Sequence, residues 1–228
     1  MPKGELFGFQ RFTSIGPFVR EEDDALYHIT RRSVLEDVLT NGIKNSTEER
    51  LQNIENPELF ARVQSHAGLE YFFDYFKPRD MSHIPNRANS IFFFNNTSVI
   101  EDKLQSLKQS DSVKATTRTA VLAVDPNKIP CMGAKASFED ARSIVNTFYD
   151  ELILEVPIPE PGEVPDKSNI YNAFDEFDFS HQQRNMLAEY WDSVTVYDGY
   201  TSGDDEIWFS CDIPPEAINS IITKEGLQ

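Results

Sequence analysis

The sequence predicts an α+β fold with mostly antiparallel strands, and two observations support this prediction. Short apolar or β-branched runs typical of strands mix with amphipathic, helix-like segments, without the regular βαβ alternation of a parallel sheet. The chain also lacks both glycine-rich patterns that hold phosphates, GxGxxG and GxxxxGK(S/T). With 228 residues, of which 39% are hydrophobic, it can bury a complete core. We therefore expect a single domain over residues 25–228, preceded by an N-terminal arm over residues 1–24.

In the first half of the domain, capping residues, glycine and proline mark where the predicted helices begin and end. A strand at residues 26–29 precedes a helix, in which Ser33 and Glu36 have capping-box spacing and Gly42 supplies a stop signal. Further along, we expect a helix that starts near residue 56, carries the aromatic residues 71–76 and ends at Pro78, then a strand at residues 89–94 and a helix that Ser98 caps.

The second half is predicted from β-branched runs, apolar spacing and prolines. We expect strands at residues 119–124, 151–156, 193–198 and 206–209, helices that begin at Ser137, Ser180 and Pro214, and an irregular, proline-interrupted stretch from residue 157 to residue 179.

The charge balance bears on partners and on compartment. A net charge of −17 opposes extended contact with a phosphate backbone, so stable non-specific nucleic-acid binding is disfavoured at ordinary salt. It fits a soluble acidic surface, or alternatively a halophile with a high-salt cytoplasm. No window reaches the roughly 18 continuous apolar residues of a membrane helix, and residues 1–12 lack the apolar run of a secretion signal. We expect a cytoplasmic protein without a membrane partner.

The metal-binding and redox residues are few. Cys131 and Cys211 form no CxxC pair, and reduced thiols are the simple expectation. The four histidines are scattered without the short spacing that presents two ligands to one metal, so no metal site is expected.

Two ionisable residues are candidates for chemistry. Glu206 stands at the start of an apolar run that contains Ile207 and Trp208. An ionised carboxylate in this position requires a partner, open solvent or a catalytic role, because packing removes its hydration. His28 is likewise embedded in the strand-like segment ALYHIT.

Three segments together resemble the ADP-ribosyltransferase superfamily. They lie at residues 25–43 (with YHITRRSVLEDVLTNGI), 87–107 (with NSIFFFNNTSVIEDKL) and 204–222 (with EIWFSCDIPPEAI). The first is similar to the opening of DNA-modifying ADP-ribosyltransferase toxins, and the other two resemble poly(ADP-ribose) polymerase catalytic domains. The resemblance implies split, mostly antiparallel sheets with flanking helices, and NAD bound in a cleft between two small sheets.

The resemblance also implies roles for individual residues. His28 would bond the adenosine ribose, the backbone at Ile29 would meet the nicotinamide amide, and Thr30 would support the strand edge. Phe92 matches an aromatic residue that lines the nicotinamide pocket, and Glu206 matches the catalytic glutamate.

Other positions depart from the family pattern. Lys103 or Leu104 stands near the place of a nicotinamide-stacking tyrosine, and Ile100 stands where the polymerases have a serine, for which Ser98 would substitute. The toxins have an arginine where this chain has Thr97, so Arg87 or Arg32 would have to reach the site to support toxin-type chemistry.

The implied reaction is transfer of ADP-ribose from NAD to a protein or nucleic-acid acceptor. Cleavage of the bond between ribose and nicotinamide builds positive charge on the sugar, which a fixed carboxylate stabilises. Two alternatives stay open: a non-catalytic nucleotide-binding or protein-interaction module of the same fold, and an RNA 2′-phosphotransferase-like enzyme. The sequence identifies neither the acceptor nor an inhibitory partner.

Overall fold

The computed structural model describes residues 10–12, 25–45, 68–95, 99–100, 119–155, 167–201 and 204–223. These residues contain one eight-stranded sheet with the order β1-β8-β4-β2-β3-β7-β5-β6. The strands are β1 (Gln10–Phe12), β2 (Leu26–Arg31), β3 (Ile91–Phe94), β4 (Thr119–Val124), β5 (Gly133–Ser137), β6 (Thr195–Val196), β7 (Asp205–Phe209) and β8 (Ile218–Thr223). Neighbouring strands are antiparallel except β1, which the arm contributes and which runs parallel to β8. The predicted α+β class with mostly antiparallel strands is confirmed.

The sheet has a narrow joint between β2 and β3. These two strands share a single residue pair, Tyr27 with Phe94, whereas β2 and β4 share six. We call β1, β8, β4 and β2 the first half-sheet, and β3, β7, β5 and β6 the second half-sheet. The joint therefore connects two four-stranded half-sheets through one residue pair.

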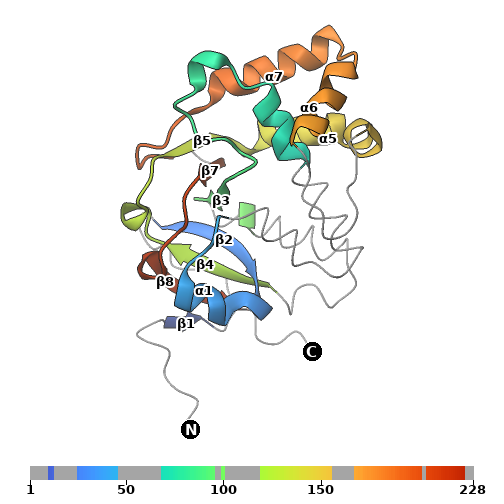
Figure 1. The fold of residues 1–228 in the computed structure, drawn as a ribbon. Coiled ribbons are helices and arrows are strands. Elements are labelled where there is room, and N and C mark those ends of the chain that lie inside the picture. The colour runs from blue at the N-terminus through green and yellow to red at the C-terminus, as the bar shows by residue number, and fades with distance from the viewer. Residues whose placement is uncertain are drawn as a thin grey trace.

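The helices are distributed unequally over the two half-sheets. They are α1 (Leu35–Asn41), a helical segment at residues 68–75, α5 (Phe138–Glu155), α6 (Lys167–Glu176) and α7 (His181–Ser193). Figure 1 shows α5, α6 and α7 gathered beside the second half-sheet, whereas α1 lies beside the first. Short 3-10 turns complete the described structure: η1 (Arg32–Val34), η2 (Arg79–Met81), η4 (Pro126–Lys128) and η5 (Pro215–Ala217).

The core lies on both faces of the sheet, because successive side chains of a strand point to opposite faces. On one face, Leu26, Phe93 and Ile207 pack with Val38 of α1. On the opposite face of the second half-sheet, Trp208 packs with an aromatic cluster from the helices. That cluster includes Phe72, Phe148, Phe174 and Trp191.

Several predicted elements are confirmed. Ser180 caps α7 through a complete capping box with Gln183, and Gly42 follows α1 in the left-handed region, at φ +79°. The aromatic helix ends before Pro78, as expected. Its predicted start near residue 56 lies outside the described residues, and so do Ser98 and most of the helix after it.

Three predicted elements are wrong. Residues 151–155 continue α5 instead of forming a strand, because they extend a helix that already buries Ala141, Ile144 and Phe148 at helical spacing. Residues 167–176, expected to be irregular, form α6, which buries Ile170 and Phe174 at the same spacing. The expected helix after Pro214 is only a 3-10 turn, since its β-branched residues pair with β4 as β8.

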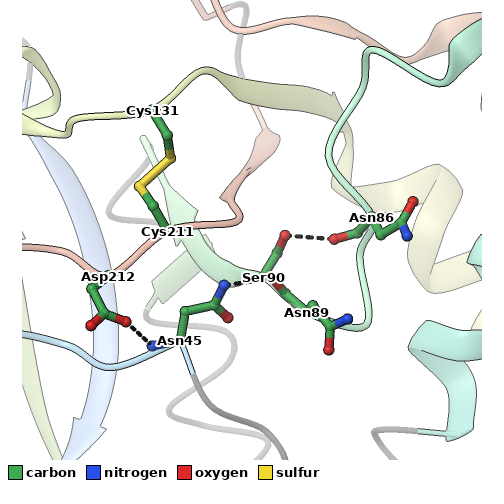
Figure 2. Close-up of a disulfide and its surroundings, with 7 residues drawn as sticks. All are labelled: Asn45, Asn86, Asn89, Ser90, Cys131, Cys211 and Asp212. Atoms are coloured by element: carbon green, nitrogen blue, oxygen red, sulfur yellow. Dashed lines mark hydrogen bonds between the residues drawn. A yellow bond between two sulfur atoms is a disulfide. The ribbon is translucent and has the colours of Figure 1, made fainter.

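Two further expectations are corrected. Ser33 does not cap a helix: it lies inside η1, α1 starts at Leu35, and neither N-cap side chain makes a capping bond. The two cysteines are not free thiols, because Cys131 and Cys211 form a disulfide (Figure 2). The expectation of a cytoplasmic compartment loses its support from the cysteines, since disulfides are rare there. No helix among the described residues has the length and apolar character to cross a membrane.

Gly42 and Gly199 provide a matched test of the close approach at the end of α1. Both have positive φ, but a Cβ at Gly42 would lie 2.1 Å from the Ile213 carbonyl oxygen, whereas a Cβ at Gly199 meets nothing within 4 Å. We expect Gly199→Ala to cost about 1 kcal/mol of backbone strain and Gly42→Ala to cost clearly more. Urea denaturation measures both changes. Equal losses would contradict the steric contribution of Ile213.

Candidate functional site

The main candidate site is a buried ionic cluster around Arg87, whose side chain is 2% exposed. The guanidinium donates from Nε to Glu70 Oε2 at 2.7 Å and from Nη2 to Glu206 Oε1 at 2.8 Å. It also donates from Nη1 to the Tyr190 hydroxyl at 2.6 Å. One cation thus binds two carboxylates and a phenol, and buried charges require such pairing.

Aromatic rings enclose the guanidinium. Its central carbon lies 4.5 Å from the ring centroid of Phe73, 4.8 Å from that of Phe92 and 5.0 Å from that of Trp208. Tyr190 contributes a fourth ring at 5.6 Å. The negative ring faces attract the cation, and the rings keep water away from it.

Three elements present the partners that surround Arg87. The helical segment 68–75 presents Glu70 and Asp74 one turn apart, α7 presents Tyr190, and β7 presents Glu206. Asp74 holds the backbone just before β3, because it accepts from the amide nitrogens of Arg87 at 2.7 Å and Ala88 at 3.0 Å. Arg87 therefore has both its main chain and its side chain fixed by the helical layer.

Burial controls the electrostatics of the cluster. It raises the pKa of Glu70, against the opposing charge of Arg87, and it raises the pKa of Asp74 against two backbone hydrogen bonds. Burial also raises the pKa of Tyr190. For Arg87, burial lowers the pKa, but the charge of Glu70 and the contacts with Tyr190 and Glu206 raise it well above its usual value.

Two of the residues named from the sequence, Glu206 and Phe92, lie at this cluster. Glu206 is the second residue of β7 and is 6% exposed. Phe92 is half-buried, and its ring faces Arg87 and Trp208. Of the two arginines that the sequence left as candidates, Arg87 reaches Glu206. Of the three explanations for a carboxylate at the start of β7, the structure therefore shows a partner, which is Arg87.

His28, Ile29 and Thr30 lie on β2 next to the narrow joint. His28 Nδ1 is 2.9 Å from the Phe92 carbonyl oxygen, so its ring bridges the two half-sheets where the ladder has stopped. Ile29 and Thr30 are half-buried and pair with Val121 and Ala120 of β4.

The structure separates His28 from Glu206 by sheet face. Tyr27, Phe94 and Glu206 form one cross-strand row, so their side chains share a face. His28 is the next residue along β2 and belongs to the other face, where its ring lies 5.5 Å from that of Phe93. The two candidate residues are two strands apart, but they do not face one common space in this structure.

Glu70, Asp74 and Tyr190 are site residues that sequence reasoning missed. A signal for two of them was present: Glu70 and Asp74 lie four residues apart in residues 69–76, where the other residues are Leu69 and five aromatic residues. Two carboxylates on one turn of an apolar helix need buried donors. In the described part of the chain, no group of three or more His, Cys, Asp or Glu side chains could hold a metal ion.

Removal of Arg87 tests the importance of the cluster for folding. Arg87→Met leaves two carboxylates without their cation, so we expect the free energy of unfolding to fall by about 3–5 kcal/mol. Arg142→Met is the matched control, because Arg142 pairs with Glu139 on the surface, with both side chains more than half exposed (52% and 63%). This control should change stability by no more than about 0.5 kcal/mol. If urea denaturation gave similar losses of stability for both variants, the buried cluster would contribute no more to stability than a surface ion pair.

The pH dependence of stability tests the electrostatics of Glu70. Its folded-state pKa lies above the usual 4.5, so the folded chain holds the proton more tightly than the unfolded chain. The free energy of unfolding should therefore rise as pH falls from the folded-state pKa towards about 4. Denaturation at pH 7, 6 and 5 should show a smaller rise in Glu70→Gln than in the wild type. The exposed Glu139→Gln should retain the full rise, and an equal rise in all three proteins would contradict the assignment to Glu70.

Comparison with protein-family models, with curated proteins and with solved structures finds no match to this chain. The proposed function therefore rests on the arrangement of residues in the structure.

Proposed function

We propose that the chain binds NAD at the joint between β2 and β3, cleaves its bond between ribose and nicotinamide, and transfers ADP-ribose to an acceptor. One observation carries the proposal. The three segments that resemble the ADP-ribosyltransferase superfamily contain β2, β3 and β7, which are three neighbouring strands although they are far apart in the sequence. Strand spacing places Tyr27 and Glu206, at the two ends of their row, about 10 Å apart.

The residues at the joint have chemistry that suits this substrate. The imidazole of His28, whose Nδ1 lies 2.9 Å from the Phe92 carbonyl oxygen, would bond the adenosine ribose. Ile29 and Thr30 continue β2 beyond the single pair with β3. The backbone at Ile29 would meet the nicotinamide amide, and Thr30 would support the strand edge. Arg87 fixes the Glu206 carboxylate through a 2.8 Å bond, and a fixed anion stabilises the positive charge that develops on the sugar. The substrate ribose would therefore have to approach Glu206 beside Arg87.

A second candidate function is nucleotide binding without cleavage. It is favoured by the 6% exposure of Glu206, by its ion pair with Arg87, and by its place on the opposite sheet face from His28. A carboxylate in these surroundings stabilises the fold whether or not it acts on a substrate. The two functions differ in whether nicotinamide is released.

Nicotinamide release from labelled NAD separates these functions. We expect wild-type protein to release nicotinamide and Glu206→Gln to lose at least about 100-fold in rate, the scale of removing one preorganised electrostatic group. Glu70→Gln is the matched control, because it removes a carboxylate from the other side of Arg87 without touching the proposed catalytic group. It should keep most of the activity. Circular dichroism establishes that both variants are folded.

The remaining outcomes are equally informative. If both folded glutamate variants lose activity to the same extent, the loss comes from disturbing the contacts of Arg87, and Glu206 has no separate catalytic role. If the wild type binds NAD in calorimetry, with His28→Ala weakening the binding, but releases no nicotinamide, the second function holds. Absence of both binding and release would refute the NAD site.

A further inference from the structure

We propose that the Cys131–Cys211 disulfide is a reversible redox clamp between two connections that join the half-sheets. Residues 125–132 lead from β4 in the first half-sheet to β5 in the second. Residues 210–217 lead back from β7 in the second half-sheet to β8 in the first. Cys131 lies in one connection and Cys211 in the other, so the covalent bond ties the two together. This proposal does not depend on the NAD reaction.

The disulfide extends the pairing of β5 with β7. The last pair of that ladder is Gly133 with Phe209, and each cysteine lies two residues beyond it, so the two are in register. Their Cα atoms are 6.2 Å apart. The Phe209 ring lies over Gly133 at this end of the ladder, since a Cβ at Gly133 would lie 2.5 Å from that ring. The clamp therefore acts on strands that are already held at a fixed separation.

The surrounding contacts reach both sides of the joint (Figure 2). Asp212, next to Cys211, accepts from the backbone nitrogen of Asn45 at 2.8 Å. The Asn45 side chain in turn donates to the Asn89 carbonyl, just before β3, at 2.7 Å. Ile213 exchanges two backbone bonds of 2.9 Å with Ile43, just after α1. A change in the backbone position at Cys211 would therefore move the residues that follow α1 and the residues that precede β3.

The disulfide is reachable by small thiols. Both cysteines are half-buried, and the residues next to them, Met132, Ser210 and Asp212, are exposed. A low-molecular-weight thiolate can attack one sulfur to form a mixed disulfide, with the other cysteine leaving as a thiolate that takes up a proton. A second small thiol then releases the first cysteine and leaves as the small-molecule disulfide. Two thiols thereby supply the two electrons and two protons of the reduced clamp, and the reverse exchange closes it.

Reduction should loosen the joint without unfolding the chain. With the clamp open, the pair of Tyr27 with Phe94, the contact of His28 with the Phe92 carbonyl and the contacts of residues 43–45 still connect the half-sheets. The apolar cluster that crosses the joint also stays in place, so we expect the chain to remain folded. The bond closes a loop across 80 positions, and the loss of such a closure lowers stability by an amount that corresponds to a fall of roughly 10–15 °C in Tm for a chain of this size.

The test equilibrates folded protein in defined mixtures of reduced and oxidised glutathione, followed by alkylation and mass spectrometry. We expect both cysteines to become alkylated together while the far-ultraviolet circular dichroism stays native. Hydrogen exchange should accelerate in residues 26–31 and 91–94, and re-oxidation should restore slow exchange. The Cys131→Ser/Cys211→Ser double variant should exchange as the reduced protein does, whatever the thiol concentration.

Three results would overturn the proposal. The disulfide could resist glutathione until the protein unfolds, reduction could unfold the chain outright, or reduction could leave exchange in β2 and β3 unchanged. The first two would identify a purely structural bond, and the third would show that the clamp and the joint are independent. If the double variant does not fold, reduced wild-type protein supplies the same comparison.

Discussion

The pairing of the Arg87 guanidinium with Glu70 and Glu206 is the interaction on which the second half-sheet depends. A single cation connects the helical segment 68–75, α7 and β7, and its backbone leads directly into β3. Desolvating one of these charges alone would cost several kcal/mol, so the elements that supply the partners have to assemble together. The aromatic rings around Arg87 increase this requirement, because they remove the water that would otherwise stabilise an unpaired charge.

The narrow joint between β2 and β3 is the second constraint on this fold. The strands pair through one residue at this joint, but an apolar cluster on one face continues across it, where Leu26 packs with Phe93 and Ile207. The aromatic cluster on the other face belongs to the second half-sheet and its helices. The narrow joint places His28 at an opening where backbone groups of two strands lie near each other. A site at this joint would lie between the two half-sheets of one continuous sheet.

The position of Glu206 is compatible with a structural role and with a catalytic role. As part of the cluster it balances Arg87 and lies almost fully buried, which is sufficient reason for a carboxylate at this position. As a member of the row with Tyr27 and Phe94, it also lies next to the strands that carry the other candidate residues. Glu70, on the other side of Arg87, shares the cation but is more exposed (25% against 7% for the side chain) and does not belong to this row. Because of that difference, substitution of Glu206 and substitution of Glu70 should have different effects on nicotinamide release.

The sequence by itself determined the elements whose signals are local. The capping box of Ser180 with Gln183, the stop at Gly42 and the strand of residues 119–124 could be predicted, because their bonds or side-chain alternation involve residues close in the chain. Local signals failed where a distant partner decides the outcome. Residues 218–223 have apolar spacing compatible with a helix, yet β4 offers them a ladder, and they form a strand.

Only the tertiary structure decided the composition of the candidate site. Cys131 and Cys211 are 80 positions apart in the sequence, and Arg87 and Glu206 are 119 positions apart. No short sequence pattern could therefore predict either contact. The sequence showed that a carboxylate at the start of an apolar strand needs a partner, since burial removes its hydration. Which side chain fills that need, and which sheet face it lies on, depends on strand order and register. Those are set by pairings between segments that are far apart in the chain.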